Sequence, residues 1–203
     1  MFRHRILNDR SLDSRYKALT EGPLAIEEIA KELVSGTDAK TDRVLEVLFF
    51  YRTPSINDII SAEIIAQAIH KRLVELQTEF ITIDPVLPAA ESIPNRLNER
   101  VRSSESTEHQ GMKRWVVAFL QSKGIAGLVQ EEVGFLGYEV DVASGKDGVF
   151  IECGDTEPRK VLTFLMSGFQ IGILQYNSES ILWFIPNPGS KGGIDSLIDG
   201  RLA

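Results

Sequence analysis

Apolar residues recur at helical spacing through most of the first hundred positions of the chain. Residues 24–34 show this spacing, with Pro23 near the start and Gly36 just past the end. Proline at the start and glycine after the end are typical of a helix. The same pattern predicts a shorter helix over residues 41–51 and a long helix over residues 55–80. The first half of the chain is therefore predicted to be helical.

The long helix predicted over residues 55–80 begins with Ser55-Ile-Asn-Asp58. This is a capping box in which aspartate replaces the more usual glutamate. Residues 81–106 then break the helical pattern with three prolines and the polar run Ser103-Ser-Glu-Ser106. We interpret them as a linker. The predicted organisation is a helical N-terminal domain of residues 1–100, without an assigned role, and a second domain of residues 101–203.

The second half of the chain alternates helices and strands. A helix is predicted over residues 107–123, because Thr107-Glu-His-Gln110 forms a capping box and Gly124 follows the last turn. A second helix is predicted from Asp155-Thr-Glu-Pro158 to about residue 167. Strands are predicted over residues 128–133, in a hairpin over residues 138–152, and over residues 170–176 and 181–185. The tail from Gly189 onward is predicted to be mobile.

The resulting order of elements in the second half is α-β-β-β-α-β-β. The helix between the third and fourth strands is a crossover, and a crossover usually brings the next strand in parallel to the previous one. The fold class predicted for the chain is therefore α/β (α+β), with a helical N-terminal region and a central mixed sheet.

Composition excludes several classes of protein. Hydrophobic residues make up 43% of the 203 positions, enough for a substantial core. No apolar run approaches the roughly 18 residues that a membrane span needs, so no membrane contact is predicted. Basic residues near Met1 are not followed by an apolar run, so no secretory signal is predicted. Cys153 is the single cysteine, and a reducing, cytoplasmic setting is predicted.

The formal net charge of −7 argues against a protein that coats nucleic acid through a broad basic surface. It does not exclude an enzyme that holds nucleic acid in one local groove. The acidic residues are unevenly placed, since eight of the twelve that follow Thr107 fall between Glu131 and Glu157. Such clustering favours a cation site, although a solvated acidic edge has the same appearance.

The hairpin carries the candidate chemistry. Gly145-Lys-Asp-Gly148 is typical of a tight turn. If that turn is symmetric, its centre falls between Lys146 and Asp147, and Asp141 then lies directly opposite Glu152. Opposed residues share one face of a sheet, so the two carboxylates would repel each other unless a cation lies between them. A divalent metal ion would remove the repulsion and supply chemistry. An ordinary amphipathic hairpin with both acids in solvent is the alternative.

Together these features resemble the PD-(D/E)XK nuclease superfamily, the restriction-endonuclease-like fold, over residues 108–186. The α-β-β-β-α-β core of that fold matches the predicted order. Its signature is an aspartate on the second core strand, matched by Asp141, and a Glu or Asp on the third, matched by Glu152. The lysine of the signature should stand at position 154, where this chain has Gly154. Some members take the lysine from the following helix, where this chain has Lys160.

The resemblance also implies roles for further residues. The superfamily often uses an acid from the first helix, and Glu108 is the best match. The alternative is that Glu108 only complements the helix dipole. His109 and Lys113 share one helical face that could line a groove or simply be hydrated. Glu132 is a reserve ligand on the strand before the hairpin, and Gln170 opens the strand after the crossover helix. Cys153 would contribute its backbone carbonyl to the metal, with its side chain in the core.

The resemblance implies a metal-dependent nuclease that hydrolyses phosphodiester bonds in DNA. Asp141, Glu152 and the carbonyl of Cys153 would hold Mg²⁺ or Mn²⁺, and Glu108 would hold a second metal or a metal-bound water. Lys160 would orient the attacking water. The absence of lysine at position 154 favours a second interpretation, a non-catalytic binding or regulatory protein on the same fold. A homodimer is compatible with both, since many enzymes of this fold act as dimers.

Overall fold

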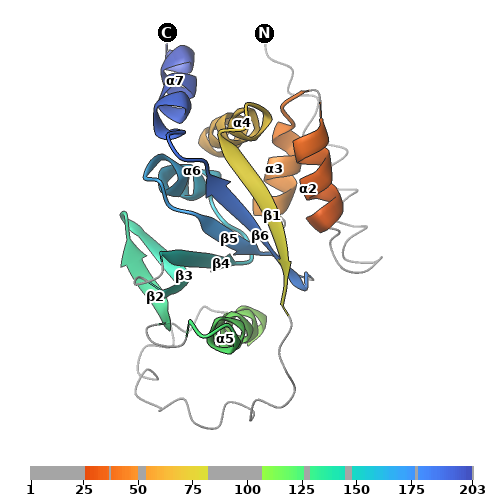
Figure 1. Cartoon of the computed structure of the whole chain (residues 1–203), viewed down its shortest axis with the longest axis vertical. Helices are drawn as coiled ribbons and strands as arrows, with labels where there is room; N and C mark the ends of the chain where they lie inside the picture. Colours follow the sequence, from red (N-terminus) through yellow and green to blue (C-terminus); the bar gives the residue numbers. More distant parts are fainter. Residues whose placement is uncertain are drawn as a thin grey trace.

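The computed structural model describes residues 26–36, 38–49, 54–81, 107–125, 129–144, 148–176 and 178–202. They form an α/β protein in which N-terminal helices are followed by a six-strand mixed sheet with interspersed helices (Figure 1). The helices are α2 (Ile26–Ser35), α3 (Thr41–Leu48), α4 (Ile56–His70), α5 (Thr107–Ser122), α6 (Pro158–Met166) and α7 (Lys191–Leu202). The strands are β1 (Val74–Phe80), β2 (Val129–Phe135), β3 (Tyr138–Ser144), β4 (Val149–Cys153), β5 (Ile171–Leu174) and β6 (Ser180–Pro186).

The strands lie side by side in the order β1-β6-β5-β4-β3-β2. Only β4 and β5 run parallel among these neighbours, and α6 connects them. The predicted crossover and the parallel pair it produces are therefore confirmed, as is the α-β-β-β-α-β-β order from α5 to β6.

The start of α4 also follows the prediction. The Ser55 hydroxyl accepts a hydrogen bond from the Asp58 backbone N–H, and the Asp58 carboxylate accepts one from the Ser55 N–H at 2.8 Å. This reciprocal pair satisfies two backbone donors that the first turn of a helix leaves open. The capping box with aspartate is therefore confirmed.

The prediction of one helix over residues 55–80 is wrong, because the segment forms α4 and then strand β1. The chain reverses at Arg72, which has a positive φ of 57° and follows the end of α4. Residues 74–80 then pair antiparallel with β6 at the edge of the sheet. The apolar positions that matched a helical stripe at Leu73 and Leu76 belong to the turn and to the strand.

The prediction of a mobile tail is also wrong. Residues 191–202 form α7, whose Ile194 is fully buried and whose Leu197 is nearly so. Both belong to the same core cluster as residues of α4 and α6. Burial of these apolar side chains provides the stabilisation that holds the helix against the body of the protein.

Helices cover both faces of the sheet, and each cover has its own core cluster. The first cluster joins α2, α3, α4, α6 and α7 to one face through residues such as Phe150 and Ile173. The second joins α5 to the opposite face through residues such as Val142 and Ile151. Figure 1 shows α5 and α6 on opposite sides of the β3–β4 region. A residue on these two strands therefore lies within reach of one helix or the other.

The N-terminal helices share a core with the second half of the chain. Gln175, at the end of β5, donates a hydrogen bond to the Val47 carbonyl of α3 at 2.7 Å, and the Thr156 N–H donates to the Leu48 carbonyl at 2.7 Å. The predicted linker of residues 81–106 and the domain boundary near residue 100 lie almost wholly outside the described residues. Within the described part, no helix combines the length and apolar character needed to cross a membrane.

Candidate metal centre

The hairpin of β3 and β4 has the register that a symmetric turn predicts. Its paired residues are Ala143 with Phe150 and the pairs on either side of them. The next position in this register brings Asp141 opposite Glu152. There the Asp141 N–H donates to Glu152 Oε1 at 3.3 Å, and the Cys153 N–H donates to Asp141 Oδ2 at 2.8 Å. Each carboxylate thus accepts a backbone N–H from the opposite strand, and the register predicted for the hairpin is confirmed for the pairs from Val142–Ile151 to Ser144–Val149.

Cys153 has its side chain on the opposite face from Glu152, as predicted. The thiol is buried in the second core cluster with Val142 and Ile151. Burial raises the pKa of the Cys153 thiol well above its ordinary value, and the Asp141 and Glu152 carboxylates raise it further. A thiol held protonated is a poor nucleophile. Cys153 acts here through its backbone N–H, and the contribution of its carbonyl to a metal stays a prediction.

Lys160 reaches the carboxylates from the first turn of α6. Its side chain is buried, and Nζ forms an ion pair with Glu152 Oε2 and donates a hydrogen bond to the Glu139 carbonyl. The structure therefore brings Asp141, Glu152 and Lys160 together from two strands and a helix. The spacing of residues in the sequence identifies Lys160 as a candidate, but it does not determine where the Lys160 side chain points.

Position 154 cannot accommodate a lysine in this backbone. Gly154 has a φ of 82°, and a Cβ atom added there would lie 2.5 Å from the Tyr176 ring. A positive φ is strained for any residue with a side chain. The ring of Tyr176 therefore occupies the space into which a side chain at position 154 would project, and the cation comes from α6.

Two further basic side chains approach Asp141 from α5. His109 Nε2 lies 3.2 Å from Asp141 Oδ1, and Lys113 Nζ lies 3.4 Å from the same oxygen. The two residues are four positions apart on α5, so they share one helical face. The spacing of the two residues in the sequence predicts that they share a face, but it does not predict that this face contacts Asp141.

Glu132 completes a row of three acids across β2, β3 and β4. The pairs Glu131 with Val142 and Val133 with Val140 place Glu132 opposite Asp141. Its φ of 55° interrupts the regular pairing at this point. Lys113 Nζ lies 3.3 Å from Glu132 Oε1, so the ammonium lies between the Glu132 and Asp141 carboxylates.

The two central carboxylates have pKa values displaced in opposite directions. Burial alone would raise the pKa of Asp141, but hydrogen bonds from His109 and the Cys153 N–H, with the charges of His109 and Lys113, lower it below its ordinary value. Burial and the Asp141 charge raise the pKa of Glu152 to about 7, against the opposing effect of Lys160. Pairs of acids with displaced pKa values are typical of functional sites.

Two predicted site residues are not brought to the carboxylates by any described contact. Glu108 lies in the first turn of α5, but its side chain is outside the described residues, so its role as a ligand stays a prediction. Gln170 precedes β5 instead of opening it. No described contact joins Gln170 to Asp141 or Glu152.

The donor set fits a hard divalent cation better than a softer metal. In the described residues, no group of three or more His, Cys, Asp or Glu side chains is arranged to hold a metal ion. Mg²⁺ commonly binds to proteins through one or two carboxylates and keeps several waters. Asp141 and Glu152 provide two carboxylates of this kind, and a carboxylate oxygen that accepts one hydrogen bond retains a second lone pair.

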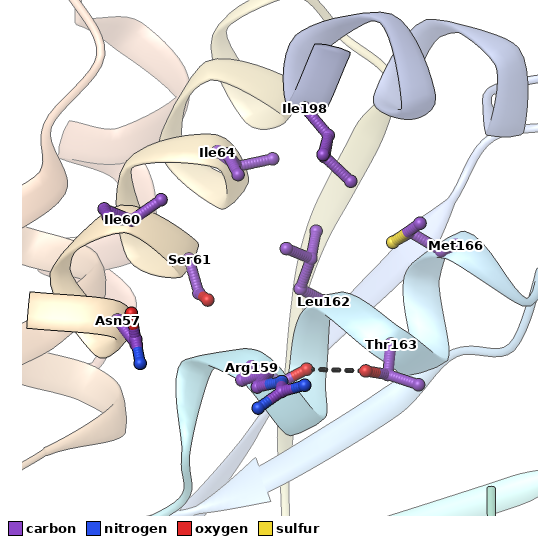
Figure 2. A pocket seen from close by; sticks show the side chains of 9 residues that line it. All are labelled: Asn57, Ile60, Ser61, Ile64, Arg159, Leu162, Thr163, Met166 and Ile198. Carbon is purple, nitrogen blue, oxygen red and sulfur yellow. Dashed lines mark hydrogen bonds between the residues drawn. The ribbon is translucent and has the colours of Figure 1, made fainter. Parts of the chain in front are cut away.

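A cavity of about 420 Å³ lies away from these carboxylates, between α4, α6 and α7. Figure 2 shows Ile60, Ile64 and Met166 around it, with Arg159 at one side. The Thr163 hydroxyl donates a hydrogen bond to the Arg159 carbonyl at 2.8 Å. Asp141 and Glu152 do not line this cavity, so it is distinct from the candidate metal centre.

Comparisons with known proteins give no family for the chain. No protein-family model matches the sequence, and no curated protein and no solved structure matches the chain.

Proposed function

We propose that the protein is a metal-dependent hydrolase of phosphodiester bonds that acts on DNA. The observation that supports this most is the chain of contacts at the end of the β3–β4 hairpin, which joins Asp141 to Glu152 and Glu152 to Lys160. Two carboxylates and a lysine are the groups that the resemblance to the PD-(D/E)XK nucleases requires. Lys160 provides the cation that Gly154 cannot.

The chemistry divides among these residues. Asp141 and Glu152 would hold one Mg²⁺ or Mn²⁺, which when bound polarises the phosphate and lowers the pKa of a coordinated water. The low pKa of Asp141 keeps that carboxylate charged and ready to bind a cation. Lys160, fixed by Glu152 and the Glu139 carbonyl, would orient the attacking water and oppose the charge that develops on the phosphate.

DNA as the substrate follows from the resemblance. The net charge of −7 requires that any nucleic acid be held locally, near the candidate metal centre, and not through a broad basic surface. The homodimer stays a prediction.

A cleavage assay tests this function. The wild type, Asp141→Asn and Glu152→Gln are incubated with Mg²⁺ or Mn²⁺ and with plasmid, linear, single-stranded and branched DNA. We expect cleavage by the wild type and loss of at least about 10³-fold in each variant, because each removes a metal ligand. Glu75→Gln, at an exposed acid on β1, is the matched control and should retain activity. Full activity of either site variant would contradict the proposal.

A specific observation favours the alternative, a non-catalytic binding or regulatory protein. Each central carboxylate already contacts an internal cation, Asp141 with Lys113 and Glu152 with Lys160. Such pairs lower the net negative charge that attracts a metal. Thermal unfolding with and without Mn²⁺ separates the two functions, since a ligand that binds only the folded state raises the melting temperature. No shift and no cleavage would favour the alternative.

A further inference from the structure

Lys113 is a buried cation that the proposed reaction does not use. Only 3% of the residue is exposed, although it lies on α5 at the edge of the candidate metal centre. Lysine is almost never this buried unless its charge is paired, because removing an ammonium from water is costly. Neighbouring anions must therefore stabilise the buried charge of Lys113.

Two carboxylates lie on either side of the Lys113 ammonium. Nζ lies 3.3 Å from Glu132 Oε1 and 3.4 Å from Asp141 Oδ1. Asp141 turns its other oxygen, Oδ2, toward β4, where it accepts the Cys153 N–H. One oxygen of Asp141 thus faces the ammonium, and the other faces the part of the site that contains Glu152. A carboxylate that bridges two metal ions is likewise contacted through both of its oxygens.

The backbone of Glu132 supports this interpretation. A φ of 55° is uncommon for glutamate, and strained backbone of this kind is retained where surrounding contacts hold it. The irregularity falls at the position opposite Asp141, between two regular pairs of β2 with β3. It brings a second carboxylate, beside that of Asp141, to the Lys113 ammonium.

We propose that the Lys113 ammonium takes the place of a second divalent cation, so that the site holds one metal ion between Asp141 and Glu152. This inference rests on the proposed function for the first ion. Lys113 is then a positioning residue, which fixes Asp141 through charge and needs no contact with substrate. Its removal leaves the Glu132 and Asp141 carboxylates adjacent without an ammonium between them, while Asp141 keeps its contacts with His109 and the Cys153 N–H. Two such carboxylates with waters are a donor set sufficient for Mg²⁺ or Mn²⁺.

The number of Mn²⁺ ions bound at saturation tests the proposal, measured by isothermal titration and native mass spectrometry at pH 8. We expect one ion in the wild type, two in Lys113→Gln, and one again in Lys113→Gln/Glu132→Gln. Lys123→Gln is the matched control, because Lys123 follows the same helix but pairs with Glu79 away from the site; it should bind one ion. If Lys113 had only a structural role, Lys113→Gln would bind fewer Mn²⁺ ions than the wild type, and not more.

Several results would overturn the proposal. They are two ions in the wild type, no gain in Lys113→Gln, or a second ion that survives removal of Glu132. If Lys113→Gln does not fold, Lys113→Met removes the charge with an apolar side chain of similar length, and the count in the wild type still applies. One ion in Lys113→Gln that depends on Glu132, with none in the wild type, would support the role of Lys113 and contradict the proposed function.

Discussion

The two sides of the candidate metal centre carry basic side chains from different helices, and their two carboxylates have pKa values displaced in opposite directions. On the α5 side, His109 and Lys113 contact Asp141, and the pKa of Asp141 falls below its ordinary value. On the α6 side, Lys160 contacts Glu152, yet burial and the Asp141 charge still raise the pKa of Glu152 to about 7. The single buried lysine therefore does not offset the increase in the pKa of Glu152 that burial causes.

This difference predicts different roles for the two carboxylates in metal binding. Asp141 is charged throughout the neutral range and can attract a cation by itself. Glu152 exchanges its proton near neutral pH, so a metal must displace a proton to bind there.

Lys160→Met should have the largest effect of any cation removal, because it leaves Glu152 buried without its ion pair. Cleavage should fall by about 10²- to 10³-fold, as when a group that stabilises developing charge is removed. The free energy of unfolding at pH 8 without metal should fall by less than the ~3–5 kcal/mol typical of a broken buried pair, since Glu152 can take up a proton. Chemical denaturation measures this. Lys123→Met, which removes an exposed ion pair with Glu79, is the control.

The double variant Lys160→Met/Glu152→Gln sharpens this prediction. If the loss of stability comes from the uncompensated charge, neutralising Glu152 should restore most of it, and the two single effects should not add. Equal losses in the single and double variants would mean that Lys160 acts through packing alone.

The pH dependence of stability should have two opposite components. The folded protein binds a proton at Glu152 between its ordinary pKa of 4.5 and about 7. Stability without metal should therefore fall as pH rises through this window, by roughly 3 kcal/mol at most. The lowered pKa of Asp141 has the other sign: its stabilising effect is present above its ordinary pKa of 3.8 and is lost as pH falls below it.

Denaturation curves between pH 3 and pH 8 in the presence of a chelator measure both components. Glu152→Gln should flatten the decline above pH 4.5 and leave the acid limb unchanged. Asp141→Asn should reduce the acid limb, and it should also lower the pKa of Glu152 because a neighbouring negative charge is gone. If both variants changed the pH dependence of stability in the same way, the two carboxylates would not differ as proposed.

Mn²⁺ binding should strengthen with pH. Since Glu152 has a pKa of about 7, its ionised fraction rises from about one tenth at pH 6 to about nine tenths at pH 8, and the affinity should rise about tenfold. Titration calorimetry in two buffers of different ionisation enthalpy would also detect the released proton. Affinity that does not change over this range would mean that Glu152 is not a ligand.

The sequence predicted the hairpin because its pattern is local. Turn chemistry and alternating β-formers determine which residues face each other, so the proximity of Asp141 and Glu152 followed without tertiary information. The direction of a helical side chain depends on how the helix lies on the sheet. For that reason Lys160 was a candidate by spacing only, and the contact of Lys113 with Asp141 was missed.

The two errors in the fold have related causes. The α4–β1 junction has no glycine, and Arg72 adopts the positive φ at which a helix can end, so the sequence lacked the usual signal. The opposite holds for α7, where Gly192 and Gly193 suggested a flexible tail. A Cβ atom at Gly193 would lie 2.8 Å from the Leu73 side chain, so this glycine allows the helix to approach closely. In both cases the local structure of the segment depends on contacts with residues that are distant in the sequence.

His109→Ala should have the smallest effect, and it tests the comparison most directly. The change removes one hydrogen bond from Asp141 Oδ1, which keeps the Lys113 charge, while Oδ2 keeps the Cys153 N–H. The free energy of unfolding near neutral pH should fall by about 1 kcal/mol, and cleavage by less than about tenfold. Because several groups hold Asp141 and Lys160 is the main cation at Glu152, an effect of His109→Ala as large as that of Lys160→Met would mean that the two sides are equivalent.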